Sequence, residues 1–288
     1  MFSRCSVSRR SALATAGVAA VALVLSACSG ASTPAATSSG TAAGPAALQT
    51  VTPGKLTVAT GQPAYSPWVI DDKPESGKGF ESAVAYAVAK QLGYPASDVV
   101  WTRSGFDAAI TPGAKTWDLN IQQFSITADR RKAVDFSSPY YTTTQAVVTT
   151  KGSKADGVTT LAGLKGVRIG VAAGTTSYTV VNDQVGQPQV YNSVDDAVQA
   201  LKTKQVDAVV TDLPGAFYIA GAQLDSGVVT GQFASSSDGG DRFAFVLPKG
   251  SALTKPVSAA VDAIRKSGQL QEITDKWLSS EVDVPVLK

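Results

Sequence analysis

Short apolar runs alternate along the chain with longer segments in which apolar side chains recur every three or four positions. This alternation of strand-like and helix-like patterns predicts an α/β protein. The segment 80–92 is the clearest helix, because Phe80, Val84 and Val88 share one face and Gly93 follows as a stop. Further helices are expected at 106–110, 128–134, 195–202, 257–267 and 270–278, with one more opened by 174–177, and strands at 55–60, 99–101, 118–121, 145–150, 167–171, 206–210 and 243–247.

A helix followed by a strand occurs twice with the same spacing of acidic residues. The pair Asp107 and Asp118 recurs, at the same interval, as Asp196 and Asp207, and each second aspartate opens an apolar strand. We interpret the pattern as one helix–strand module used once in each half of the fold, with a chance match as the alternative. The ends of the two strands would then be equivalent and face one cleft, where ligands of open α/β sheets bind.

The N-terminal 27 residues are typical of a secretion signal, with three arginines ahead of an apolar run. The sequence LSAC that ends at Cys28 resembles a lipobox, which predicts a diacylated cysteine; a plain signal peptide with an incidental cysteine is the alternative. Residues 28–53 are rich in Ser, Thr, Ala, Gly and Pro, which predicts a flexible linker. The folded part is therefore expected outside the cytoplasm, anchored to the cell membrane by lipid on Cys28.

Composition excludes several kinds of chemistry. The chain has no histidine, and its two cysteines are Cys5, in the predicted leader, and Cys28. Catalysis by Ser-His-Asp or Cys-His groups and an ordinary zinc site are therefore excluded, and no cofactor or metal is expected. Without the three arginines of the predicted leader, the 25 basic residues fall to 22 against 23 acidic ones, which gives no support to nucleic-acid binding.

The segment 122–141, QQFSITADRRKAVDFSSPYY, combines groups that suit a small anion. Thr127 is a good N-cap for a short helix, and a helix start offers free N–H groups and a partial positive charge. Arg130 in its first turn adds a planar pair of donors that matches a carboxylate, and Ser125 adds a hydroxyl. The alternative is a surface helix whose charged side chains are merely solvated.

The same segment resembles a family signature. The pattern S-I-T-x-x-R-x-K-x-V-D-F-S-x-P-Y-Y, from Ser125 to Tyr141, is similar to that of the solute-binding proteins of polar amino-acid ABC importers, bacterial extracellular solute-binding protein family 3. The similarity runs from about Gly54 to Trp277. It implies a two-lobed, periplasmic-binding-protein-like (type II) α/β fold with two mixed sheets flanked by helices and a hinge. Residues 54–145 and 244–288 would form lobe 1 and residues 146–243 lobe 2, in a monomer.

The resemblance also implies roles for individual residues. Arg130 would hold the carboxylate of an amino acid, and Asp212 would take its ammonium together with the Gln123 backbone. The residues expected to assist Arg130 are Ser125, Thr176 and Ser177. Alternative roles remain for two of these positions, because Asp212 and Thr176 could each be a helix N-cap.

Selectivity for the ligand side chain is expected from a second set of residues. Tyr65, Phe106 and Trp68 fall where related proteins place aromatic walls, although ordinary core packing is the alternative for each. Many relatives that bind cationic amino acids carry Asp where this chain has Gln62, and relatives usually carry small residues where it has Gln122 and Gln123. These three amides favour an uncharged polar side chain, such as that of glutamine, or a smaller pocket for a small polar ligand, over a cationic side chain; Gln122 facing away from the cleft is the alternative.

The resulting hypothesis is a lipid-anchored receptor that captures a polar amino acid and delivers it to ABC permease subunits. One alternative is a dehydratase-type enzyme on the same fold, which needs a general acid in the cleft. The acids near the first loop and helix are Asp72, Glu75 and Glu81, and Glu81 is interpreted more simply as a favourable first-turn charge. The other alternative is a sensor lipoprotein that serves no transporter.

Overall fold

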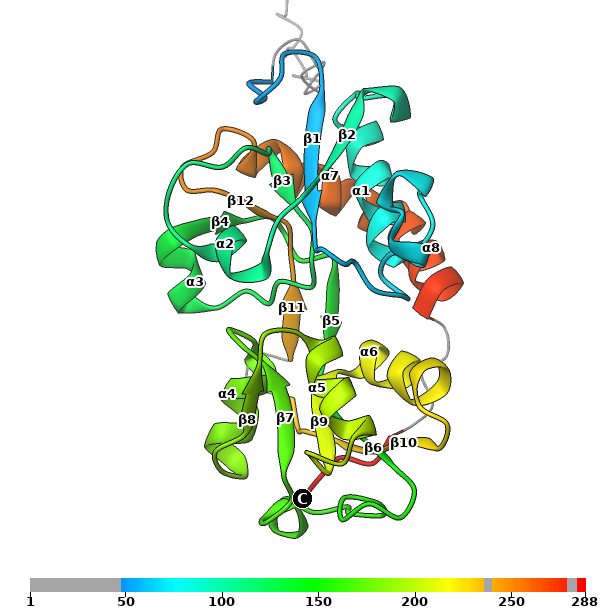
Figure 1. Cartoon of the computed structure of the whole chain (residues 1–288). Helices are drawn as coiled ribbons and strands as arrows, with labels where there is room; N and C mark the ends of the chain where they lie inside the picture. Colours follow the sequence, from blue (N-terminus) through cyan, green and yellow to red (C-terminus); the bar gives the residue numbers. More distant parts are fainter. Residues whose placement is uncertain (1–47, 236–239, 279–283) are drawn as a thin grey trace, which may run out of the picture. The chain divides into compact units, whose positions relative to one another are not determined.

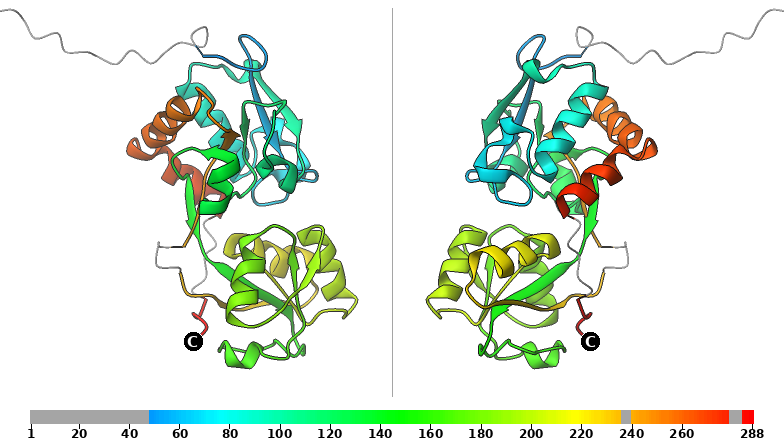
Figure 2. Two further views of the ribbon diagram at one scale, coloured as in Figure 1. Left: turned by 90° about the vertical axis from the view of Figure 1, so that its left-hand side faces the viewer. Right: turned by 90° about the vertical axis from the view of Figure 1, so that its right-hand side faces the viewer.

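A computed structural model describes residues 48–235, 240–278 and 284–288, all within one unit, Thr41–Lys288. Its strands form two five-stranded sheets and a two-stranded ribbon (Figures 1 and 2). The first sheet has the order β2-β1-β3-β12-β4, and the second has the order β10-β6-β9-β7-β8. The predicted secretion signal, Cys28 and most of the predicted linker lie outside the described residues.

The first sheet is mixed. β1 pairs in parallel with β2 and β3, and β12 is antiparallel to β3 and β4. Leu56 and Val58 of β1 contact the core formed with α1, α7 and α8, whereas Ala59 contacts the core on the side of α2. Every residue of β1 is buried, because helices cover both faces of the strand. The bounds are β1 Leu56–Thr60, β2 Val99–Arg103, β3 Leu119–Asn120, β4 Val134–Phe136, β12 Val246–Pro248, α1 Phe80–Gln91, α2 Phe106–Ile110, α3 Ala128–Ala133, α7 Thr254–Lys266 and α8 Gln269–Leu278, with short 3₁₀ turns at Ile70–Asp72, Pro74–Ser76 and Ala96–Asp98.

The second sheet is also mixed. β7 pairs in parallel with β8 and β9, while β6 is antiparallel to β9 and β10. Val148 and Val209 contact the core formed with α5 and α6, and Val147 and Val210 contact the opposite core, which includes Val181 of α4. The bounds are β6 Gln145–Thr150, β7 Ile169–Ala172, β8 Gln189–Tyr191, β9 Ala208–Asp212, β10 Gly227–Gln232, α4 Thr176–Gln184, α5 Val194–Lys202 and α6 Leu213–Tyr218, followed by a π-helical turn at Ile219–Gln223 and preceded by a 3₁₀ turn at Ala162–Leu164.

The chain crosses between the sheets along a two-stranded ribbon. β5, Tyr141–Thr143, pairs antiparallel with β11, Asp241–Phe243. β5 leads into β6 of the second sheet, and β11 leads into β12 of the first (Figure 1). The single strand expected at 243–247 is therefore two strands, because the chain leaves the ribbon after Phe243 before it joins the first sheet.

The repeated helix–strand module predicted from the sequence is present. Asp118 and Asp207 are both buried, and each accepts hydrogen bonds from a backbone N–H on a neighbouring segment. Asp118 Oδ2 accepts from Thr57 at 2.7 Å, and Asp207 Oδ2 accepts from Arg168 at 3.0 Å. The strand that follows each aspartate runs parallel to its neighbour, β1 or β7, so the two halves use the same local construction.

The last residues correct one expected boundary. Residues 284–288 do not return to the first sheet with α7 and α8 but lie against the second. Val284 and Leu287 are buried in the two cores of that sheet, and the Leu287 N–H donates to the Gln232 carbonyl at 2.8 Å. Assignment of residues 284–288 to lobe 1 is therefore wrong, because their apolar side chains are buried on lobe 2.

In the part of the chain that the structure describes, no helix combines the length and the apolar character needed to cross a bilayer.

Candidate functional site

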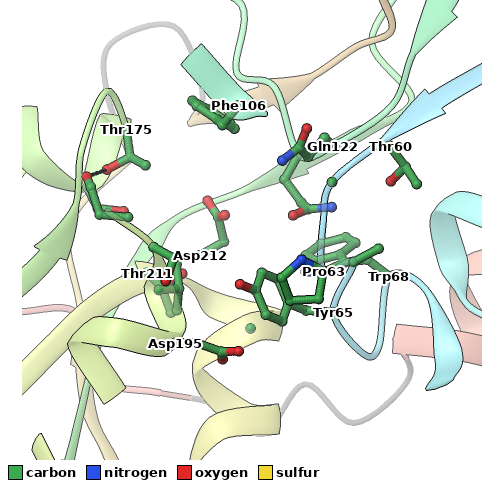
Figure 3. A pocket seen from close by; sticks show the side chains of 18 of the residues that line it. Thr60, Pro63, Tyr65, Trp68, Phe106, Gln122, Thr175, Asp195, Thr211 and Asp212 are labelled. Atoms are coloured by element: carbon green, nitrogen blue, oxygen red, sulfur yellow. Dashed lines mark hydrogen bonds between the residues drawn. The ribbon is translucent and has the colours of Figure 1, made fainter. Parts of the chain in front are cut away.

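Strand ends from both sheets meet at one pocket of about 260 Å³ (Figure 3). Thr60 ends β1, Ala172 ends β7 and Asp212 ends β9, and all three residues line the pocket. Thr211 and Asp212 were expected just beyond their strand, but they are its last two residues. The pocket therefore lies at the carboxyl ends of the strands, which is where open α/β sheets bind ligands.

All the side chains predicted to form the ligand site line this pocket. Those from the half that carries the first sheet are Gln62, Tyr65, Trp68, Phe106, Gln122, Gln123, Ser125 and Arg130; those from the other half are Thr176, Ser177 and Asp212. The structure thus brings together residues that are far apart in the sequence. Their contact with a ligand stays a prediction.

Arg130 is held at the start of α3. Thr127 caps this helix as predicted, because its side chain accepts a hydrogen bond from the Arg130 N–H at 3.1 Å. The guanidinium lies 5.2 Å from the centroid of the Phe106 ring. Nη1 donates to the Ser125 carbonyl at 2.7 Å, and Nη2 donates to the Gly174 carbonyl at 2.8 Å. Since a guanidinium has five N–H groups, it keeps donors for a carboxylate.

The charge of Arg130 is buried without a direct counter-ion. Its side chain makes no ion pair with any residue that the structure describes. Burial lowers the pKa of Arg130, and the more distant charges of Asp241, Asp212 and Asp107 oppose that effect. A buried cation without a partner is costly, so an anionic group that enters this pocket would relieve the cost.

Asp212 occupies the N-cap position of α6, but its side chain makes no capping hydrogen bond. The carboxylate instead accepts a hydrogen bond at Oδ1 from Gln145 Nε2 at 2.7 Å. Burial raises the pKa of Asp212 to about 8; the nearby charge of Asp241 adds to the rise, and the bond from Gln145 opposes it. The capping alternative therefore describes the backbone position only, and the carboxylate remains available to the pocket.

Gln145 and Asp241 do not line the pocket but bond to side chains that do, and the sequence did not reveal either of them. Gln145 Nε2 also donates to Asp241 Oδ2 at 2.6 Å, and Gln145 Oε1 accepts from Ser177 Oγ at 2.5 Å. Thr176 Oγ1 donates to Asp241 Oδ2 at 3.1 Å. Gln145 thus fixes Asp212 relative to the start of α4. Gln145 could have been suspected from the sequence, because it is a polar residue at the start of the apolar strand 145–150. No feature of the sequence pointed to Asp241.

The cap of α4 is Thr175 rather than Thr176. The Thr175 side chain accepts a hydrogen bond from the Tyr178 N–H at 3.3 Å. The alternative of Thr176 as the N-cap is therefore wrong, because this residue begins the helix proper. Its Oγ1 lies 3.4 Å from Ser125 Oγ, so hydroxyl groups from both halves of the fold meet beside the pocket.

Glu81 lies in the first turn of α1 as expected, but its carboxyl group is fully buried. It accepts a hydrogen bond from the Gln123 backbone N–H at 2.8 Å, and also bonds to the Gln123 amide and the Tyr140 hydroxyl. Burial raises the pKa of Glu81 to about 7. Gln123 has a left-handed backbone with φ of 49°, and these bonds hold it in that conformation beside the pocket.

The aromatic residues combine the two roles considered for them. Phe106 stacks on Phe124 with ring centroids 4.6 Å apart and also lines the pocket. Trp68 is 3% exposed and makes edge-to-face contacts with Phe80 and Phe243, so most of its ring belongs to the core. The labelled side chains of Phe106, Trp68 and Tyr65 surround the pocket in Figure 3.

Gln122 faces the pocket rather than away from it (Figure 3). Its Oε1 is buried and has no hydrogen-bond partner among the described residues. Gln62 lines the pocket as well but is exposed. The pocket therefore offers a buried cation, a partly exposed acid, hydroxyl groups and amides within aromatic walls, a set that suits a small zwitterion with a polar side chain.

Comparisons with known proteins agree with this geometry. Residues 56–280 match the bacterial extracellular solute-binding proteins, family 3. The chain is 30% identical over 221 residues to the L-cystine-binding protein TcyJ of Escherichia coli K12, covering 76% of this chain and 80% of that protein. It is 32% identical over 206 residues to the ABC transporter arginine-binding protein 1 of the same strain, covering 69% and 81%. A solved ancestral arginine-binding protein bound to arginine matches with a TM-score of 0.65 and 31% identity, covering 78% of this chain and 98% of that one.

Two mixed sheets, each flanked by helices, share a polar pocket at their strand ends. This arrangement defines a two-lobed binding protein of the periplasmic type. The chain belongs to the bacterial extracellular solute-binding proteins of family 3. The predicted family and fold class are therefore confirmed, and the family is one of extracytoplasmic amino-acid-binding proteins.

Proposed function

We propose that this protein is a lipid-anchored extracytoplasmic receptor that binds a polar amino acid and delivers it to an ABC importer. One observation carries the proposal: Arg130, a buried cation, and Asp212, a partly exposed acid, line the same pocket without forming an ion pair with each other. A free amino acid carries a carboxylate and an ammonium on one carbon. It supplies the missing partner for each of these groups.

The roles follow from the contacts. The guanidinium of Arg130 receives the carboxylate with help from the hydroxyl groups of Ser125 and Thr176, and Asp212 receives the ammonium. Because Arg130 and Asp212 come from different halves of the fold, a bound zwitterion stabilises the arrangement in which both halves contact it. Each charge-assisted hydrogen bond contributes about 1.5–3 kcal/mol, which is consistent with roughly micromolar affinity, about −8 kcal/mol.

The relatives support an amino acid as the ligand and an ABC importer as the partner. One is an L-cystine-binding protein, and another is the arginine-binding protein of an ABC transporter. The lipid anchor rests on the LSAC sequence at Cys28 and on the linker-like composition of residues 28–53. Two acyl chains on that cysteine would hold the receptor beside the permease.

The enzyme alternative receives less support from the geometry. Of the acids considered for it, Asp72 forms an ion pair with Arg103 at 2.5 Å, and Glu81 is committed to Gln123 and Tyr140. Neither of these two residues nor Glu75 lines the pocket. We therefore propose binding without chemical conversion; appearance of product from a prephenate-like substrate would contradict this.

The first test is the binding of amino acids to purified protein by calorimetry. We expect Arg130→Ala and Asp212→Asn each to weaken binding of the best ligand at least 100-fold, because each leaves one charge of the zwitterion without a partner. Arg131→Ala is the matched control, since Arg131 is the exposed neighbour on the same helix. Unchanged affinity in both pocket variants would refute the proposed site.

The second part of the proposal is tested in cells of the source bacterium. Uptake of the labelled ligand should require both this protein and a permease, and Cys28→Ser should release the protein from the membrane fraction. Normal binding without any effect on uptake would instead identify a sensor lipoprotein.

A further inference from the structure

A second acid lies in the same pocket, away from the position of Arg130. Asp195 lines the pocket next to Tyr65, on the side opposite Phe106 (Figure 3). Arg130 lies over Phe106, and Asp212 lies between the two ends in this view. A zwitterion held by Arg130 and Asp212 would therefore direct its side chain past Tyr65 toward Asp195.

Asp195 neither caps its helix nor pairs with a basic side chain among the described residues. It lies in the first turn of α5, where Ser193 already provides the cap by accepting a hydrogen bond from the Asp196 N–H at 3.1 Å. Asp195 forms no ion pair within the described part of the chain. Burial raises its pKa, with a smaller contribution from Asp196, while a bond from Gln223 and the charge of Lys202 lower it.

The surroundings of Asp195 have an excess of hydrogen-bond acceptors. Gln223 lines the pocket and bonds to Asp195 through its side chain. Its Oε1 is buried, with no hydrogen-bond partner in the part of the chain that the structure describes. Two acceptors, one of them charged, therefore face this end of the pocket beside the ring of Tyr65. A cation with several N–H donors satisfies both, and an aromatic ring next to it adds a favourable contact.

We propose that Asp195, with Gln223, selects an amino acid whose side chain ends in a second cationic group, a guanidinium or an ammonium. The proposal rests on the proposed function, since it assumes that Arg130 and Asp212 hold the main-chain groups of the ligand. It also revises the expectation of an uncharged ligand drawn from Gln62. The acid missing at position 62 is replaced by one from the opposite half of the fold.

The chain contains its own control for this proposal. Asp196 is the next residue on the same helical turn, but it is exposed and does not line the pocket. Asp195→Asn and Asp196→Asn remove the same charge from the N-terminal turn of α5, so both lose the same favourable interaction with the helix dipole. Only Asp195→Asn removes a carboxylate from the pocket.

The ligand pair for the test is arginine and citrulline, which differ in the charge of the side-chain end but hardly in shape. Their dissociation constants are measured by calorimetry for the wild type and both variants. We expect the wild type to bind arginine at least tenfold more tightly than citrulline. Asp195→Asn should reduce this preference to about threefold or less, mainly because arginine binds more weakly to the variant. Asp196→Asn should retain the wild-type preference.

Two results would overturn the proposal. One is a wild type that binds citrulline or glutamine as tightly as arginine; the other is an equal loss of preference in both variants, which would assign the effect to the helix and not to the pocket. Failure of the proposed function is distinguishable, because then neither arginine, citrulline nor glutamine would bind and Arg130→Ala would change nothing.

Discussion

At the scale of single residues, the main feature is the cluster of carboxyl groups around Gln145. Asp212 and Asp241 accept hydrogen bonds from the same amide nitrogen, so two carboxyl groups face each other across one donor. Burial, with a further contribution from the nearby charge of Asp241, raises the pKa of Asp212 to about 8. Near neutral pH the unliganded site therefore keeps a proton on Asp212, and an incoming ammonium must displace it.

The expected consequence is binding that depends on pH. Since the ammonium of the ligand favours ionised Asp212, affinity should rise from pH 6 to pH 8, by up to about tenfold per unit, as the proton is lost more easily. Asp241→Asn should shift this dependence to lower pH, because it removes a charge that raises the pKa of Asp212. Calorimetry in buffers of different ionisation enthalpy should show proton release on binding. Affinity that is constant between pH 6 and pH 8 would contradict the assignment.

At the scale of secondary-structure elements, the short helix α3 determines where the guanidinium lies. It spans only Ala128–Ala133, so its start depends on the cap supplied by Thr127. Loss of such a cap costs about 0.5–2 kcal/mol. A six-residue helix has little other support, because short helices are marginal without tertiary contacts.

We therefore expect Thr127→Ala to weaken ligand binding several-fold and to lower the free energy of unfolding by about 1 kcal/mol. The freed Arg130 N–H and the loosened first turn would move the guanidinium away from its bonds to Ser125 and Gly174. Thr127→Ser is the control, because its hydroxyl can still cap the helix. Calorimetry and urea unfolding measure the two effects; equal affinity in the Ala and Ser variants would exclude this role of the cap.

At the scale of the whole molecule, the two halves approach one another at Gly174. Its carbonyl accepts the bond from Arg130, and its φ of 69° lies in the left-handed region. A Cβ at this position would lie 2.4 Å from Oδ1 of Asp107, which belongs to the other half. Glycine therefore permits both the turn before α4 and the close approach across the pocket.

We expect Gly174→Ala to lower affinity about tenfold, since the added methyl group displaces Asp107 and disturbs the bond between Arg130 and the Gly174 carbonyl. Gly152→Ala is the matched control: its φ is 78°, but nothing lies within 4 Å of an added Cβ. Both variants should lose about 1 kcal/mol of stability from backbone strain. Only Gly174→Ala should change the dissociation constant, and an equal effect of both would contradict this explanation.

Much of the candidate site could be predicted from local sequence. The cap at Thr127, the short helix with Arg130, and the strand that leads to Asp212 depend on neighbouring residues and on apolar periodicity, which the sequence displays directly, although the predicted strand stops at residue 210 and the observed one continues to Asp212. The same is true of α1 and of the repeated helix–strand module. Fold class followed from these elements together with the family signature.

The tertiary structure alone decided which polar side chains enter the site. Glu81 and Asp195 both stand in the first turn of a helix, and sequence gives them the same interpretation; yet Glu81 is fully buried against Gln123, and Asp195 lines the pocket. Asp241 meets Gln145 across 96 positions of chain. Apolar periodicity records which face of an element is buried, but which partner covers that face depends on contacts between distant segments. Those contacts set the charge of the pocket, and hence which ligand we expect it to bind.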